Sequence, residues 1–173
     1  MTATSPNRRI AAIAAVIFAL DQLTKWAVLN YLNFADEKII VPGFFKFVHW
    51  VNTGAAWSLF TGNNGLLALV ALVALFVLYF SRHHFGAGTP LGQLALGLIF
   101  GGICGNLTDR LLPSRHHVVD FLYFFLRTSD GKEHGFPAFN LADSAICVGV
   151  GLVFLLNWKS AGPAAEKTTD AQG

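Results

Sequence analysis

Long apolar stretches alternate with polar segments along the whole chain. Several of them come near the length of about 20 mostly apolar residues that a membrane-spanning helix needs. These stretches are residues 10–31, 63–81, 90–112 and 141–158. The connection between the second and third stretches is short, whereas residues 32–62 and 113–140 form long connections. The pattern predicts a chain that crosses a membrane four times, with both long connections in one compartment.

A shorter periodicity occurs within the first long connection. Residues 38–41 and 44–51 are rich in β-branched and aromatic residues, and Pro42-Gly43 between them is a turn signal. The pattern predicts a small sheet that rests on the membrane surface, with amphipathic aromatic rings at the interface. The residues expected on one face of this hairpin are Phe45, Phe47 and Val51.

The predicted fold class is an all-α polytopic membrane protein with four transmembrane helices, a small extracytoplasmic β-sheet and an outer loop or short helix. We expect residues 1–173 to form a single integral-membrane domain, with a disordered tail over about 160–173. Composition agrees, since 54% hydrophobic and 13% charged residues exceed what a soluble core of this size could bury. The net charge of +2, without a basic run, argues against nucleic-acid binding.

Basic residues near the helix ends predict the orientation, because Lys and Arg in short cytoplasmic segments favour the inside. On the side of the termini they are concentrated close to the apolar stretches: Arg8, Arg9, Arg82, Lys159 and Lys167. On the other side they are spread over the long connections: Lys38, Lys46, Arg110, Arg115, Arg127 and Lys132. We therefore place both termini in the cytoplasm.

Small residues recur in the third apolar stretch. Gly97, Gly101 and Gly105 are spaced by four residues, with Gly102 beside them. Residues of this size at this spacing form a strip where another helix can approach closely. We expect the strip to pack against a helix of the same chain, and a substrate helix is the alternative.

Polar side chains end the same stretch. Asn106 and Arg110 are four residues apart, so both project from one helix face near the outer surface, where they could grip a peptide backbone. As an alternative, Arg110 anchors the helix at the membrane surface or pairs with Asp109. In the first stretch Asp21 and Lys25 are also four apart, and we expect them to neutralise each other as an ion pair that supports the fold.

Two aspartates in apolar surroundings are the strongest functional signal. A carboxylate in a membrane helix costs about 2.5 to 3.5 kcal/mol on insertion scales and usually has a function. Asp143 has a structural alternative, since Asn140 lies three residues before it, where a helix N-cap would sit. Capping does not explain Asp120, which interrupts the apolar run 118–126. We therefore predict that the two aspartates share one site.

A pair of close carboxylates has a definite chemistry. Both cannot ionise easily, so one keeps a proton while the other stays charged, which provides a general acid and a general base at one pH. Such a pair can activate water for peptide hydrolysis of the aspartic type. Ser144 has no evident histidine base, and the histidines occur as adjacent pairs without an H-E-x-x-H motif, so we expect neither a serine nucleophile nor a zinc site. Cys104 and Cys147, in apolar stretches, are expected to behave as small hydrophobic residues, and no cofactor is expected.

Ordered motifs across nearly the whole chain resemble those of lipoprotein signal peptidase, or signal peptidase II. These motifs are Asp21-Gln22-x-x-Lys25, Asn52-Thr53-Gly54-Ala55-Ala56-Trp57-Ser58, Gly101-Gly102-x-x-Gly105-Asn106-x-x-Asp109-Arg110, Val118-Val119-Asp120-Phe121 and Phe139-Asn140-x-Ala142-Asp143-Ser144. Each motif alone is weak, but five in this order are highly specific. The resemblance implies that Asp120 and Asp143 are a catalytic dyad, with Asp21 and Lys25 supporting the fold. The residues that it implies line the site are Asn52, Gly54, Asn106, Arg110 and Asn140.

The same resemblance implies the activity and its setting. The family removes the signal peptide from bacterial prolipoproteins just before a cysteine that carries diacylglycerol, and globomycin, a cyclic peptide, inhibits it. We accordingly expect a multi-pass protein of the bacterial inner membrane with its site at the outer leaflet, a lipid-bearing substrate and a monomeric state. We also expect the aromatic outer loop with Trp57 to act as a lid hinged at Gly54.

Other functions fit part of the pattern. Intramembrane acids also mark proton relays in transporters and channels, and the candidate path here is Asp21, Asp109, Asp120 and Asp143. Against this, the four stretches show no internal repeat, which most transporter designs have. A third interpretation is a non-catalytic membrane assembly protein in which the glycine strip matters and the aspartates are helix caps.

Overall fold

The computed structural model describes residues 5–54 and 62–160 of the chain, apart from the side chains of residues 159 and 160. Within this part four helices are long and apolar enough to cross a membrane. They are α1 (Pro6–Tyr31), α2 (Asn64–Ser81), α3 (Pro90–Leu111) and α4 (Leu141–Ser160). A 3-10 turn, η2 (Arg82–Phe85), continues α2 towards α3. The predicted set of transmembrane helices is therefore confirmed.

The helix ends follow from local sequence signals. Helix α1 begins four residues before the predicted apolar stretch, because Pro6 occupies the first helical turn, where its missing N–H is not needed. Helix α3 likewise starts with Pro90, and the Thr89 hydroxyl accepts a hydrogen bond from the Gly92 N–H at 3.0 Å. The motif residues 55–58, the predicted short outer helix, the lid with Trp57 and the tail from residue 161 lie outside the described residues.

Helix α3 is the centre of the bundle. Of its apolar window 56% is buried, against 17% or less in the other membrane helices of the described chain. A methyl group on Gly101 would lie 2.7 Å from the Ala14 carbonyl oxygen of α1, and one on Gly102 would lie 2.5 Å from the Ala142 carbonyl oxygen of α4. The glycine strip thus packs against helices of this chain, as expected, and it brings the motifs of α1 and α4 to opposite sides of α3.

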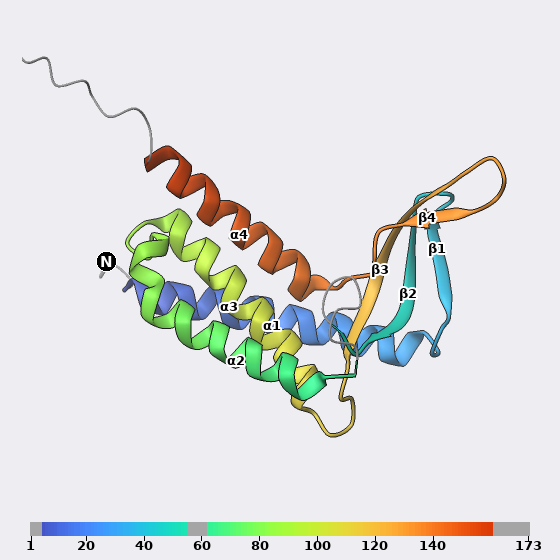
Figure 1. Ribbon diagram of the computed structural model, residues 1–173, viewed down its shortest axis with the longest axis horizontal. Helices are drawn as coiled ribbons and strands as arrows, with labels where there is room; N and C mark the ends of the chain where they lie inside the picture. Colours follow the sequence, from blue (N-terminus) through green and yellow to red (C-terminus); the bar gives the residue numbers. More distant parts are fainter. Residues whose placement is uncertain (1–4, 55–61, 161–173) are drawn as a thin grey trace, which may run out of the picture.

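An antiparallel sheet lies at one end of the helices (Figure 1). In the described chain its strands are β1 (Glu37–Val41), β2 (Phe45–Asn52), β3 (Val118–Arg127) and β4 (Glu133–Gly135), in that spatial order. The predicted hairpin is confirmed as β1 and β2, with Gly43 at a φ of +76° in the turn. Strands β3 and β4 were not predicted, since the apolar run of β3 lacks the alternation that marks a half-buried strand.

One detail of the hairpin prediction is wrong. Phe45 and Phe47 share a face and touch, with ring centroids 5.2 Å apart. Between Phe47 and Trp50, however, β2 has one more residue than the paired segment of β3. This β-bulge reverses the alternation, so Val51 falls on the other face. The bulge also sets the register that pairs Trp50 with Asp120.

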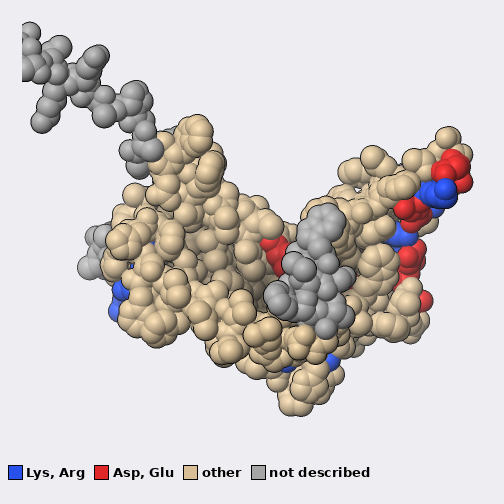
Figure 2. Space-filling model, in the orientation of Figure 1, with Lys and Arg blue, Asp and Glu red and all other residues tan. Residues whose placement is uncertain are grey.

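The sheet faces the bundle across a hollow (Figure 2). The start of α1 and the end of α4 lie at the end of the bundle opposite the sheet, so both long connections emerge on one side, as predicted (Figure 1). Charged side chains gather over the far end of the sheet, where the nearly buried Lys46 contacts Glu37 at 2.6 Å and Glu133 at 2.8 Å (Figure 2). Hydrogen bonds from Lys46 and Arg127 lower the pKa of Glu133, which keeps this cluster charged near neutral pH.

Candidate active site

Asp120 lies near the start of β3 and is 3% exposed. The antiparallel register pairs Asn52 of β2 with Val118, two residues before Asp120. From there the Asn52 amide donates to Oδ2 of Asp120 at 2.9 Å. The Asn140 amide donates to Oδ1 of Asp120 at 2.8 Å. Both oxygens of this buried carboxylate are therefore hydrogen-bonded, as burial of a polar group requires.

Asp143 stands in the first turn of α4 and is half-buried. Its backbone N–H donates to Oδ1 of Asn140 at 3.0 Å, and the Asn140 N–H donates to Oδ2 of Asp143 at 3.2 Å. This is the reciprocal capping arrangement that the sequence offered as an alternative to catalysis. Capping uses only one carboxylate oxygen, because Oδ1 of Asp143 accepts a hydrogen bond from the Asn106 amide at 2.7 Å. The capping role and a chemical role are thus compatible in one side chain.

Asn140 joins the two aspartates. It is fully buried, its amide donates to Asp120, and its backbone and side chain exchange hydrogen bonds with Asp143. Burial and, after it, the charge of Asp143 raise the pKa of Asp120 to about 7, against hydrogen bonds from Asn52 and Asn140 that lower it. The two carboxylates that the sequence predicted to share a site are close enough to interact electrostatically, and near neutral pH one of them holds a proton for much of the time.

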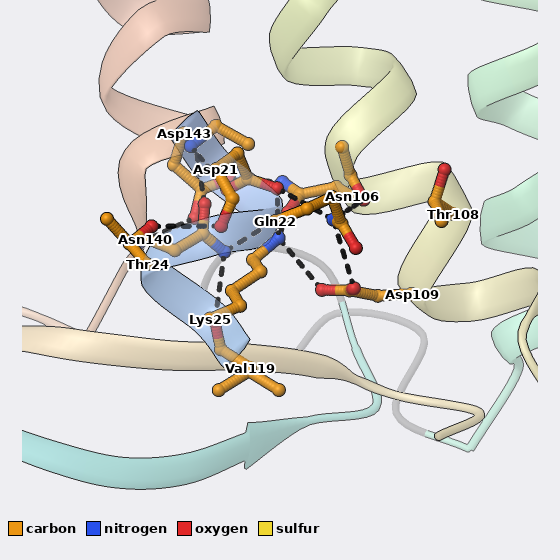
Figure 3. A network of polar contacts seen from close by, with 12 residues as sticks. Asp21, Gln22, Thr24, Lys25, Asn106, Thr108, Asp109, Val119, Asn140 and Asp143 are labelled. Atoms are coloured by element: carbon orange, nitrogen blue, oxygen red, sulfur yellow. Dashed lines mark hydrogen bonds and ion pairs between the residues drawn. The ribbon is translucent and has the colours of Figure 1, made fainter. Parts of the chain in front are cut away.

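A charged network lies behind the aspartates (Figure 3). Lys25 of α1 is fully buried, and its ammonium lies 2.9 Å from Oδ2 of Asp21 and 2.8 Å from Oδ2 of Asp109. It also donates to Oδ1 of Asn106 at 2.8 Å. Asp21 in turn accepts the Ala142 backbone N–H at 3.0 Å, which ties α1 to the first turn of α4. The predicted Asp21–Lys25 ion pair is confirmed, and it is part of a larger network than the sequence indicated.

Arg110 and Gly54 meet on the other side of the site. The Arg110 guanidinium donates to the Gly54 carbonyl at 2.8 Å and to Oδ1 of Asn64 at 3.0 Å. The Gly54 N–H donates to Oδ1 of Asn52 at 2.9 Å. Arg110 therefore holds the backbone that orients Asn52, and it is not the partner of Asp109, which pairs with Lys25 and Arg115.

The structure connects every residue that the sequence singled out for the site. Residues that sequence reasoning missed are Gln22, Asn64 and Arg115. Gln22 belongs to the first motif, whereas Asn64 and Arg115 lie in polar connections, where nothing distinguishes them from solvated residues. Within residues 5–54 and 62–160 no group of three His, Cys, Asp or Glu side chains is arranged to hold a metal ion.

The geometry supports general acid–base chemistry. Asp120 and Asp143 provide a pair of carboxylates in which one is protonated near neutral pH, and the surrounding amides hold both in fixed orientations. The Ser144 hydroxyl donates to the Asn140 carbonyl at 2.9 Å, which is a helix-capping interaction. The arrangement thus resembles an acid–base pair that activates water more than a serine nucleophile with its base.

Comparisons of sequence agree on one family. The sequence model of the family described as signal peptidase (SPase) II matches residues 13–159. The lipoprotein signal peptidase of Symbiobacterium thermophilum is 42% identical over 147 residues, which cover 84% of this chain and 90% of that protein. The lipoprotein signal peptidase of Bacillus subtilis is 35% identical over 143 residues, which cover 83% and 88%.

Solved structures give the same result. Two structures described as bacterial membrane enzymes superpose with TM-scores of 0.77 and 0.69, each at 27% sequence identity. The first alignment covers 91% of this chain and 93% of the other, and the second covers 88% and 94%. The likeness therefore includes both the helix bundle and the sheet that carries Asp120.

Proposed function

The chain belongs to the signal peptidase II family, and from this premise we propose that it is an aspartic endopeptidase with Asp120 and Asp143 as its catalytic dyad. Its substrates would be diacylglyceryl-modified bacterial prolipoproteins, cut on the N-terminal side of the lipidated cysteine. The observation that carries the proposal is the contact of both carboxylates with one buried residue, Asn140.

The proposed division of labour follows from the surroundings of each carboxylate. Asp120 is buried, and its pKa of about 7 favours the protonated form below neutral pH. Asp143 lies at the N-terminal end of α4, where the helix dipole favours a negative charge, and it accepts N–H groups on both oxygens. We therefore assign the resting proton to Asp120 and the role of general base to Asp143.

The reaction then proceeds in two steps. The Asp143 carboxylate takes a proton from water as the water oxygen attacks the scissile carbonyl carbon, while the Asp120 carboxyl donates to the developing oxyanion. In the second step the C–N bond breaks, and the leaving nitrogen takes the proton held by Asp143. The products are a signal peptide with a new carboxylate and a lipoprotein with a free amino group, so no covalent enzyme intermediate is formed.

The position of the site suits a substrate that stays in the bilayer. Asp143 begins a membrane helix and Asp120 lies in the adjoining sheet, so the dyad lies at the border between the apolar bundle and the polar end of the molecule. Acyl chains could then remain in lipid while water reaches the dyad from the aqueous side. We place this border at the outer leaflet of the bacterial inner membrane, with both termini in the cytoplasm, and expect a monomer that globomycin inhibits.

The test is cleavage of a purified diacylglyceryl-modified precursor in detergent or lipid, read by intact mass. Asp120→Asn and Asp143→Asn should each fold and bind precursor but leave it uncut, because each removes one proton-transfer group. Asp36→Asn, at an exposed turn that contacts Asn33, is the matched control and should cut normally. Normal cleavage by either dyad variant would refute the proposal, and proton flux without cleavage would favour a transporter.

A further inference from the structure

The Asn106 side chain is held in one of two possible orientations (Figure 3). Its Oδ1 accepts a hydrogen bond from Lys25, and its Nδ2 donates to Asp143. An amide has an acceptor at one end and donors at the other, whereas an ammonium can only donate. Lys25 therefore requires the oxygen of Asn106 on its own side, and the N–H donors are left to face Asp143.

The other amides at the dyad are oriented differently. Asn140 and Asn52 are fixed by backbone donors, the N–H groups of Asp143 and Gly54. The Asn140 amide also reaches Oδ1 of Asn106 at 3.1 Å, but it already donates to Asp120 at 2.8 Å. Lys25 is thus the side chain whose replacement would release the orientation of Asn106.

Charge and burial keep Lys25 in its donating form. Asp21 and Asp109 flank its ammonium, and neither carboxylate is exposed. Arg115 pairs with Asp109 from the following loop, so two acids and two bases balance. The charged groups that act on Asp143 come from all the neighbouring elements: Asp21 and Lys25 of α1, Arg110 of α3 and Asp120 of β3.

We propose that Lys25 is a positioning residue of the reaction: through Asn106 it keeps an N–H donor directed at Asp143 and thereby keeps that carboxylate ionised as the general base. The proposal rests on the function assigned to the dyad above. Lys25 is fully buried and acts through another residue, so it does not touch the substrate.

The experiment must remove the ammonium without leaving an unpaired buried charge. Lys25→Met alone would strand two carboxylates, so the test protein is Lys25→Met combined with Asp21→Asn, which leaves Asp109 paired with Arg115. The matched control is Arg115→Lys, which alters the same network but keeps its charge and does not touch Asn106. Thermal unfolding in detergent shows whether each variant is folded.

The expected result is a lower kcat, by about 10- to 100-fold, with an unchanged KM. Losing a hydrogen bond that favours the charged carboxylate should also move the acidic limb of the kcat/KM profile up by about one pH unit. The Arg115→Lys profile should match that of the wild type. A folded double variant with the wild-type kcat and acidic limb would overturn the role of Lys25.

A double-mutant cycle separates positioning from a general loss of stability. If Lys25 acts through Asn106, then Asn106→Ala should cost far less activity in the double-variant background than in the wild type. Fully additive losses would overturn the proposal. Failure of the dyad assignment is recognised separately, because it would show as cleavage by Asp120→Asn or Asp143→Asn.

Discussion

Asp120 is the residue at which burial and hydrogen bonding oppose each other most directly. Removal from water and the charge of Asp143 raise its pKa from 3.8 to about 7, although two amides donate to it. A carboxyl that binds its proton more tightly in the folded state than in the unfolded state makes folding less favourable as pH rises through this interval. The dyad is thus a source of instability that the rest of the molecule offsets.

This effect predicts a pH dependence of stability. Between pH 5 and pH 8 the folded protein retains a proton that the unfolded chain loses, so the wild type should lose stability, by about 3 kcal/mol from the shift of Asp120. In Asp120→Asn this part of the decline should vanish. Thermal unfolding in detergent at both pH values measures it, with the exposed Asp130→Asn as control. An equal decline in Asp120→Asn would show that Asp120 is not the titrating group.

Asn52 should tune the same proton. Its amide donates to Oδ2 of Asp120 and favours the charged form, so Asn52→Ala is expected to raise the pKa of Asp120. The basic limb of the kcat/KM profile should then move to higher pH. Asn157→Ala, which removes an exposed amide that contacts only its own helix, should leave the limb in place. A shift to lower pH in Asn52→Ala would contradict the assignment of the proton.

At this scale the sequence predicts chemistry better than contacts. The cost of an acid in apolar surroundings was enough to single out Asp120 and Asp143, since it depends only on neighbours along the chain. The contact between them depends on an antiparallel register and a helix cap, neither of which was derived from the residues. Asn64 was missed for the same reason, because its partner Arg110 is 46 positions away.

At the scale of elements, the close packing of α1 on α3 fixes the network behind the site. A methyl group on Gly105 would lie 2.4 Å from Oδ2 of Asp21, a carboxylate that cannot move away because Ala142 and Lys25 hold it. The approach of these helices therefore requires glycine at this position, independently of backbone conformation.

Gly105→Ala should destabilise the protein by about 1 to 3 kcal/mol through overpacking. It should also reduce cleavage, because Asp21 is tied to the first turn of α4 through Ala142. The matched control is Gly151→Ala in α4, where a new methyl group meets no atom within 4 Å and helix propensity favours alanine. Thermal unfolding and cleavage of both variants provide the comparison. Equal stability of the two would argue against the packing constraint.

The elements divide according to how local their signals are. Apolar length predicts the membrane helices, and a Pro-Gly turn between β-branched runs predicts the first hairpin. Strand β3 was not predicted, because it is buried along its first residues and so lacks alternation. The bulge in β2 has no signal in the residues either, although it determines the pairing of Trp50 with Asp120.

At the scale of the whole molecule, one end carries the sheet and the dyad, and the opposite end carries the termini and η2 (Figure 1). The bias of basic residues towards short segments near the second end predicts that this end is cytoplasmic. The order of helices and the side on which the connections emerge follow from the sequence. The separation of the carboxylates does not, because it depends on how the sheet rests on the bundle.

The orientation can be tested with single cysteines. Asp130→Cys lies at the exposed far end of the sheet, and His84→Cys lies at the exposed turn between α2 and α3. In intact cells stripped of any outer barrier, a membrane-impermeant thiol reagent should label only Asp130→Cys. After lysis it should label both. Labelling of His84→Cys alone before lysis would invert the assignment.

The central claim is that Asp120 and Asp143 form one acid–base pair with the proton on Asp120. Infrared difference spectra of the purified protein across pH 5 to 9 test it most directly, because a protonated buried carboxyl has its own C=O band. We predict a carboxyl band that titrates near pH 7 in the wild type, is absent from Asp120→Asn, and titrates at lower pH in Asp143→Asn, where the neighbouring charge is gone. Persistence of the band in Asp120→Asn, or an unchanged titration in Asp143→Asn, would contradict the account.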